Sequence, residues 1–186
     1  LFRDEDDPEI YYAYSNKVGP EVYKNKMVSE VFEPGSIFKP LAMAAAINAG
    51  EVEPNSTFYE GGPLKVDEFE IHTYDNVYRG TQTMTQVLEH SSNVGMAFIA
   101  QKLGRSLFYS YLKAFGFTER ADFGIQDEAL GTLAPPDTWA DSELVTKAFG
   151  QGISVTPIQM IQAFSAITNG GVMMQPYIIK KIEYSN

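Results

Sequence analysis

The 186-residue sequence contains no cysteine, two histidines and one tryptophan. Without cysteine the chain can have no disulfide, no thiolate metal site and no cysteine nucleophile. Basic residues are scarce as well, since 14 Lys and Arg stand against 24 Asp and Glu and give a formal net charge of -10. Because a surface that binds nucleic acid needs an excess of positive charge, we expect no nucleic-acid partner.

Long hydrophobic runs are also missing. No apolar stretch approaches the roughly 20 residues of a membrane-spanning helix, and the first residues are charged, unlike those of a signal peptide. We therefore expect no membrane span in this chain. Hydrophobic residues still make up 44% of the sequence, which is enough for the packed core of one domain.

Hydrophobic periodicity and helix-ending residues predict helices over 36–48, 83–89, 93–103, 107–115 and 156–168. The stretch 65–71 has the alternation of a small hairpin, and 177–184 has that of a strand. Glycine and proline predict a loop over 118–142, and extended segments with turns are expected over 1–31. The pattern is that of a mainly α chain with small β hairpins.

Ser36 and Lys39 stand at the start of the alanine-rich helix predicted over 36–48. Pro40 fixes this start, because proline is tolerated only near the first turn of a helix. Residues three apart share a helical face, so the Lys39 amine is predicted to reach the Ser36 hydroxyl. Burial and the positive end of the helix dipole both favour the neutral amine, which can take the proton of a serine nucleophile. A capping serine beside a solvated lysine has the same spacing.

A second polar group, Ser91-Ser92-Asn93, lies between two predicted helices. A hydroxyl and an amide two residues apart at such a junction can point into one cleft. Helix capping favours the same residue types. We expect the turn formed by Ser91 and Asn93 to face Ser36 and Lys39 across a shared groove.

Three segments together resemble the transpeptidase domain of class B penicillin-binding proteins, the type used in cell division and elongation. They are 33–40 (EPGSIFKP), 90–95 (HSSNVG) and 149–160 (FGQGISVTPIQM), and they occur in the order found in that family. The likeness runs from about Tyr14 to Pro176, which is nearly the whole chain.

The resemblance implies a serine-type D,D-transpeptidase that forms an acyl-enzyme on D-alanyl-D-alanine stem peptides of peptidoglycan and cross-links them. It assigns Ser36 as nucleophile, Lys39 as base, Ser91 as proton relay toward the leaving amine, and Asn93 as the residue that holds Lys39 and the substrate amide. β-Lactam antibiotics would acylate the same serine. No cofactor and no metal are implied. The implied partners are stem peptides, β-lactams and division or elongation proteins, at the extracytoplasmic face of the bacterial cell membrane.

The third motif of the family, Lys-Thr/Ser-Gly on a strand that lines the cleft, is absent from the sequence. We therefore expect residues 1–186 to form a partial transpeptidase domain. It would be the helical portion of the α+β fold shared with serine β-lactamases, without most of the central antiparallel sheet. That strand supplies an oxyanion-hole donor in relatives, and losing one such donor costs about 10²- to 10³-fold in rate. This chain by itself is expected to react with penicillin slowly or not at all.

Two other functional classes are compatible with a serine and lysine at this spacing. One is a non-catalytic β-lactam sensor or a scaffold for division partners, and relatives of the sensor type carry an apolar residue where this chain has Asn93. The other is a serine β-lactamase, which needs a deacylating carboxylate or modified lysine that the sequence does not identify. Asn93 thus favours the transpeptidase.

The remaining polar and aromatic residues have simpler explanations. Asp67, Glu68 and Glu70 are predicted to be solvated and not a glycosidase pair, and the two histidines lack the spacing of a zinc site. His90 is adjacent to Ser91, but adjacent residues point in different directions, which argues against a Ser-His pair. Gly150-Gln151-Gly152 is predicted to be a tight turn and not a nucleotide loop, and Trp139 is predicted to pack in the core.

Overall fold

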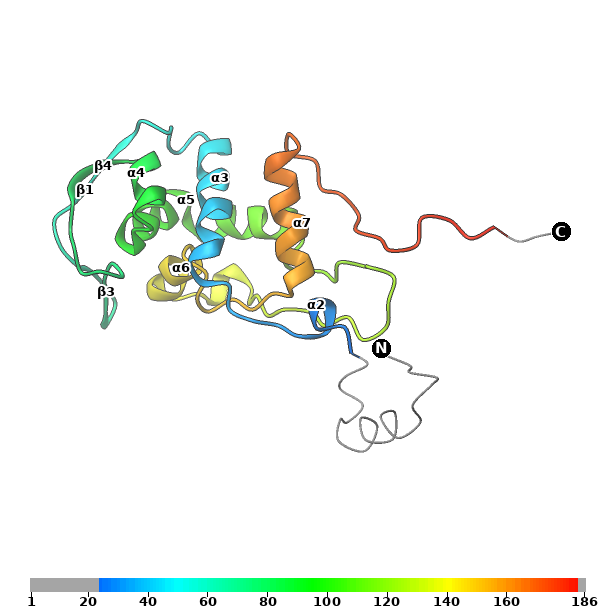
Figure 1. Cartoon of the computed structure of the whole chain (residues 1–186). Helices are drawn as coiled ribbons and strands as arrows, with labels where there is room; N and C mark the ends of the chain where they lie inside the picture. The colour runs from blue at the N-terminus through cyan, green and yellow to red at the C-terminus, as the bar shows by residue number, and fades with distance from the viewer. Residues whose placement is uncertain (1–23, 184–186) are drawn as a thin grey trace, which may run out of the picture.

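The computed structural model describes residues 24–183, so the expectations for 1–23 and 184–186 lie outside the described residues. The helices lie side by side, and the short strands lie at one end of the molecule (Figure 1). In chain order the elements are α2 Lys26–Ser29, the 3-10 helix η2 Gly35–Phe38, α3 Lys39–Asn48, β1 Thr57–Glu60, β2 Leu64–Val66, β3 Phe69–Ile71, β4 Gly80–Thr83, α4 Met84–Glu89, α5 Asn93–Ala114, the 3-10 helix η3 Pro136–Thr138, α6 Asp141–Lys147 and α7 Pro157–Thr168.

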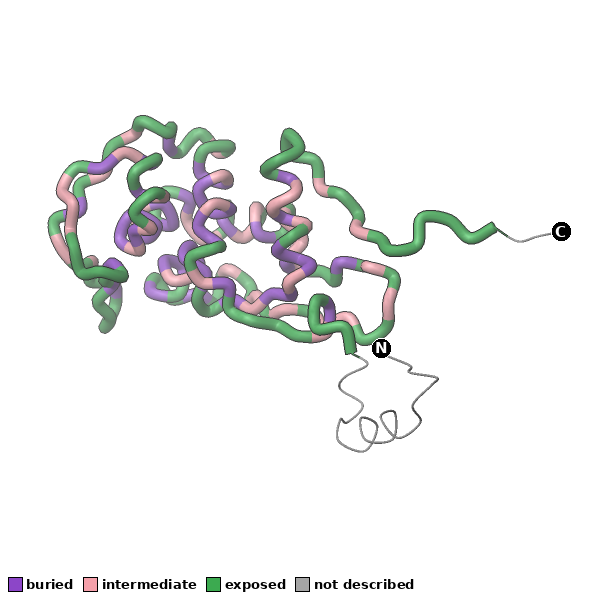
Figure 2. Tube along the Cα trace, viewed as in Figure 1, coloured by how far each residue is buried: buried purple, intermediate pink, exposed green. Residues whose placement is uncertain are grey.

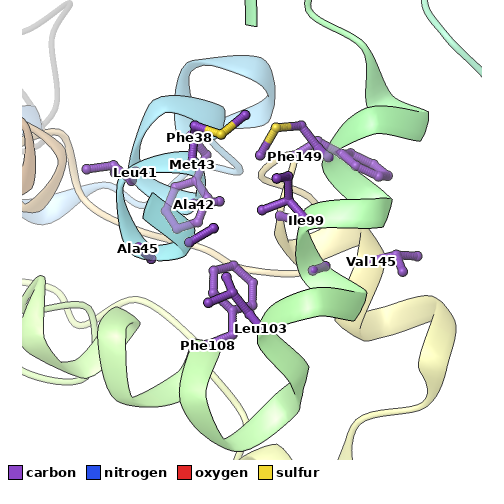
Figure 3. Packing of buried hydrophobic residues seen from close by; sticks show 14 of the residues in the cluster. Phe38, Leu41, Ala42, Met43, Ala45, Ile99, Leu103, Phe108, Val145 and Phe149 are labelled. Carbon is purple, nitrogen blue, oxygen red and sulfur yellow. The ribbon is translucent and has the colours of Figure 1, made fainter. Parts of the chain in front are cut away.

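The core lies where α3 packs on α5 and α5 packs on α6. Figure 2 shows the buried positions concentrated on the facing sides of these helices. The close view in Figure 3 shows Leu41 and Ala42 of α3 with Ile99 and Leu103 of α5, all of them buried. Phe38, the last residue of η2, is fully buried. The 3-10 turn that carries Ser36 is therefore anchored directly in the core.

The strands form two separate antiparallel pairs in the described part of the chain. β1 pairs with β4, with Glu60 opposite Gly80, and β2 pairs with β3, with Leu64 opposite Ile71. The second pair confirms the hairpin predicted over 65–71. β1 and β4 carry the chain from the end of α3 to the start of α4.

The predicted helices are present, with adjusted starts. α4 and α7 begin one residue later than predicted, because Thr83 and Thr156 are their N-caps and accept hydrogen bonds from the backbone. The two helices predicted over 93–115 form α5, which has a non-helical break at Gly104, where φ is +68°. The helix predicted over 36–48 begins as a 3-10 turn and becomes α-helical at Lys39.

Three sequence predictions were wrong. Residues 177–183 pair with no strand in the described part of the chain, and a strand needs a hydrogen-bonded neighbour. Residues 26–29, expected to be extended, form α2, because the Asn25 side chain accepts a hydrogen bond from Met27 N. α6 begins at Asp141, within the predicted loop, where Asp67 from the β2–β3 turn accepts a hydrogen bond from Ser142 N.

Across residues 24–183, no helix combines the length and the apolar composition that crossing a bilayer requires.

Candidate active site

Ser36 lies on the surface of a cleft of about 290 Å³, in the 3-10 turn that precedes α3. Its backbone position is held from one side by an extended segment. Phe32 N donates to Val155 O at 2.9 Å, and Val155 N donates to Phe32 O at 3.0 Å. Three residues further on, Gly35 N donates to Gly150 O at 2.9 Å. The turn with Ser36 is thus fastened to the segment that joins α6 to α7.

Gly150 is required at this point of contact. Its φ is +78°, a conformation that favours glycine. A Cβ atom at residue 150 would lie 2.2 Å from Gly35 O, which is far inside van der Waals contact. The tight turn predicted for Gly150-Gln151-Gly152 agrees with the positive φ of both glycines. The contact of Gly150 with the backbone of Gly35 was not predicted from the sequence, because it joins residues far apart along the chain.

Lys39 lies one turn beyond Ser36 and is only 2% exposed. Its Nζ atom donates to Ser91 O at 2.5 Å, to Ser91 Oγ at 2.9 Å and to Asn93 Oδ1 at 2.7 Å. The predicted meeting of Lys39 with the turn formed by Ser91 and Asn93 is confirmed. Burial disfavours the charged ammonium and lowers the pKa of Lys39 to about 8. The amine can therefore lose its proton near neutral pH.

The structure differs from the sequence prediction in the direction of that amine. Among residues 24–183, no hydrogen bond joins the Ser36 hydroxyl to Lys39 Nζ. Lys39 Nζ instead donates its hydrogen bonds to three acceptor atoms of the 91–93 turn. Ser36 and Ser91 line the same cleft, so a substrate in the cleft would lie between the serine of η2 and the turn that holds the lysine.

The 91–93 turn joins α4 to α5 and has an uncommon conformation. Ser91 has a φ of +53°, which few non-glycine residues adopt. Ser92 is the N-cap of α5, and its Oγ accepts a hydrogen bond from Gly95 N at 2.8 Å. Asn93 Nδ2 donates to His72 O at 2.9 Å, which fixes the amide so that Oδ1 faces Lys39. Both atoms of Ser91 that contact Lys39 depend on this turn.

Several further residues line the cleft. They are Gly35, Tyr74, Asp75, His90, Asn93, Phe149 and Gln151. Asp75 is the one carboxylate among them, and its hydrogen bond with Arg79 lowers its pKa to about 2. Its other oxygen accepts from Val77 N at 3.0 Å. Such a weak base with both oxygens occupied is poorly suited to activate water, which a β-lactamase requires.

Other candidates from the sequence lie elsewhere in the fold. Trp139 is 3% exposed and packs edge-on against Phe108, which confirms the core prediction. Asp67 is exposed and contacts the first turn of α6. His72 contacts Tyr78 through Nδ1 at 3.0 Å. Within residues 24–183, no three His, Asp or Glu side chains come together as metal ligands would.

Comparison with known proteins places these features in one family. The family model described as the penicillin binding protein transpeptidase domain matches residues 3–186. Stage V sporulation protein D of Bacillus subtilis is 37% identical over 176 residues, which are 94% of this chain and 27% of that protein. Peptidoglycan D,D-transpeptidase FtsI of Escherichia coli is 31% identical over 163 residues, or 88% of this chain and 27% of that protein.

Solved structures agree with the sequence comparison. Penicillin binding protein 3 of Mycobacterium tuberculosis, complexed with aztreonam, has a TM-score of 0.78 and 35% identity. The match covers 84% of this chain and 35% of that one. The chain therefore spans about a quarter of the curated relatives and a third of this solved relative. With matched sequence, matched fold and a lysine buried against the 91–93 turn, this chain belongs to the penicillin-binding protein transpeptidase domain family.

Proposed function

We propose that this chain carries the catalytic serine of a peptidoglycan D,D-transpeptidase, with Ser36 as nucleophile and Lys39 as base. One observation carries the proposal: the buried Lys39 amine, with its pKa lowered to about 8, is held by Ser91 and Asn93 beside the cleft that Ser36 lines. A serine hydroxyl needs a neighbouring group to accept its proton. The Lys39 amine beside this cleft can be neutral near pH 8 and can therefore accept that proton.

In the proposed acylation one proton moves from Ser36 to Lys39 and then to the leaving amine. Ser36 Oγ attacks the penultimate carbonyl of a D-alanyl-D-alanine peptide and gives its proton to Lys39 Nζ. The C–N bond then breaks, the acyl group stays on Ser36, and the leaving amine of D-alanine takes the proton. An amine of a second stem peptide later attacks the ester and releases Ser36, which completes the cross-link.

Ser91 is the group best suited to pass the proton onward. Of the three acceptors around Lys39 Nζ, the Ser91 carbonyl and Asn93 Oδ1 can only accept hydrogen bonds. The Ser91 hydroxyl both donates and accepts. It can therefore take a proton from Lys39 on one side and deliver it to the leaving amine on the other. Asn93 keeps the amine in place and remains unchanged.

The proposed substrates and partners follow from relatives. The Escherichia coli relative is named a peptidoglycan D,D-transpeptidase, and the solved relative is complexed with aztreonam, which is a β-lactam. We propose stem peptides as substrates, β-lactams as acylating inhibitors, division or elongation proteins as partners, and a site of action outside the cytoplasmic membrane.

Prolonged incubation with benzylpenicillin tests the proposal directly. We expect the chain to gain the mass of one penicilloyl group over hours, and peptide mapping to locate the adduct on Ser36. The Ser36→Ala variant should gain none, because the attacking hydroxyl is gone. Intact mass spectrometry measures both.

The same experiment separates the alternatives. An adduct on another residue of the wild-type chain, or an equal adduct on the Ser36→Ala variant, would contradict Ser36 as the nucleophile. Sustained hydrolysis of nitrocefin would identify a β-lactamase, because a transpeptidase acylates once and releases the product very slowly.

The pH dependence of acylation tests Lys39 as the base. With a pKa of about 8, about a tenth of Lys39 is neutral at pH 7 and about nine tenths at pH 9. Since only the neutral amine accepts a proton, the rate should rise between pH 7 and 9 and then level off. The time course of the adduct at each pH gives the profile, after subtraction of the Ser36→Ala background. A rate that falls over this range would exclude a lysine base.

A further inference from the structure

Glu60, the last residue of β1, is a buried carboxylate behind the candidate site. It is 1% exposed, although glutamate is almost never fully buried unless it is paired. No cation lies within ion-pair distance of it among the described residues. Burial of a charge is costly unless hydrogen bonds compensate.

Three donors converge on the Glu60 carboxylate. Its Oε1 accepts a short hydrogen bond from the Ser92 hydroxyl. Its Oε2 accepts from Gln82 Nε2 at 2.8 Å and from Arg79 N at 3.2 Å. In all three contacts the carboxylate oxygens act as hydrogen-bond acceptors. Of these donors, Ser92 is part of the 91–93 turn, and Gln82 contacts His90, which precedes it.

Ser92 connects Glu60 to the start of α5. Its hydroxyl donates to Glu60 and accepts from Gly95 N at 2.8 Å. The hydroxyl therefore donates to the carboxylate and accepts from the first turn of the helix. Because both roles are filled, the Ser92 side chain has a single orientation, and the backbone on either side of it is fixed.

Gln82 connects Glu60 to the other side of the turn. Its Nε2 faces Glu60, so its Oε1 faces His90 Nδ1 at 2.7 Å. An amide oxygen only accepts, which means that His90 Nδ1 carries the proton. His90 lines the cleft. The residues before and after Ser91 are therefore both tied to the same carboxylate.

We propose that Glu60 is a positioning residue that holds Ser91 in its left-handed conformation and so keeps the Ser91 oxygens and Asn93 against Lys39. Left-handed conformations of residues other than glycine persist only where the surroundings enforce them. Ser91 has a φ of +53° and provides two of the three acceptors for Lys39 Nζ. Relaxation of this turn would move both oxygens away from the amine. The proposal rests on the proposed function for its catalytic meaning.

The Glu60→Gln variant tests the link at almost constant shape. A glutamine at residue 60 accepts at one atom only, so it cannot satisfy both Ser92 and the Gln82–Arg79 side. We expect acylation of Ser36 by benzylpenicillin to slow by about 10- to 100-fold, as is usual when a reacting group is slightly misplaced. The maximal rate of acylation should fall, and the benzylpenicillin concentration that gives half of this rate should stay nearly unchanged.

A double-mutant cycle shows whether Glu60 acts through Ser92. We expect Ser92→Ala to slow acylation to a similar degree, and the double variant to be no slower than either single one. Additive losses would overturn the proposed route, and an unchanged rate in Glu60→Gln would overturn the role of Glu60.

Gln159→Ala is the matched control for lost stability. Gln159 is also fully buried, donates to Gly116 O and Glu119 O, and is not among the residues that line the cleft. This variant should lower the melting temperature and leave the acylation rate unchanged. If it slowed acylation as much as Glu60→Gln at equal loss of stability, Glu60 would be only structural.

A second readout keeps this inference separate from the proposed function. Carbon NMR of the lysine Cε follows the titration of Lys39 without any acylation. We expect the Lys39 midpoint to shift in Glu60→Gln and in Ser92→Ala, but not in Gln159→Ala. A shift of the midpoint in both variants, without acylation of the wild type, would support the positioning role and leave the proposed function without support. Acylation of the wild type, with a Lys39 midpoint that is unchanged in both variants, would support the proposed function and reject the positioning role of Glu60.

Discussion

The Lys39→Met variant is expected to leave Ser36 unmodified by benzylpenicillin under conditions in which the wild-type chain is acylated. Methionine has a similar length and fills the same buried space, but it accepts no proton. A general base contributes about 10²- to 10⁴-fold to such reactions. A loss of this size places the adduct below detection by intact mass spectrometry over the same hours.

Lys147→Met is the matched control for this prediction. Lys147 on α6 is also 2% exposed, and burial lowers its pKa as well. Its Nζ lies 5.0 Å from the centre of the Trp139 ring and outside the residues that line the cleft. We expect this variant to be acylated at the wild-type rate. Loss of acylation in both variants, or in neither, would contradict a specific role of Lys39.

The two buried lysines show why burial alone does not make a base. Both lose solvation and both favour the neutral amine. Lys39 differs because its amine contacts Ser91, a side chain that can carry a proton onward into the cleft. Lys147 lies over an aromatic ring, which stabilises a cation and offers no proton path. The partner of the amine, and not its pKa, distinguishes the two.

Much of the site could be predicted from the sequence because its parts are local. Pro40 and the alanines fix the start of α3, and the turn between α4 and α5 is marked by its capping residues. Both features depend on neighbours within a few residues. The family resemblance implied that Asn93 holds Lys39, and this hydrogen bond is present. The bond from Lys39 to the Ser91 hydroxyl goes beyond the expectation that this turn faces Lys39.

The remaining features depend on contacts between distant parts of the chain. Glu60 looks like an ordinary polar residue of an edge strand until β1 and β4 bring it beneath Ser92. α6 is short, and one backbone N–H of its first turn, that of Ser142, donates to Asp67 from a separate hairpin. The strand predicted after residue 176 had the right alternation but no partner in the described part. Local pattern specifies a preference, and a distant neighbour decides whether it is realised.

Gly150→Ala is expected to displace the turn that carries Ser36 and to abolish acylation. The new Cβ would lie 2.2 Å from Gly35 O and 2.6 Å from Gly35 N, both of them backbone atoms. Backbone cannot move aside as a flexible side chain can, so the hydrogen bond from Gly35 N to Gly150 O must break. Left-handed strain and overlap together should cost about 2–4 kcal/mol of unfolding free energy. Urea denaturation measures the cost, and peptide mapping measures the adduct.

Gly124→Ala separates the two causes. Gly124 has a similar φ of +83°, but a Cβ there would meet nothing within 4 Å. This variant therefore carries the conformational strain alone, about 1–2 kcal/mol, and should be acylated normally. The difference between the two variants isolates the contact of Gly150 with Gly35. Equal losses of stability with acylation intact in both would mean that Gly150 serves only its own turn, and that the position of Ser36 is fixed by the buried Phe38 and not by the segment between α6 and α7.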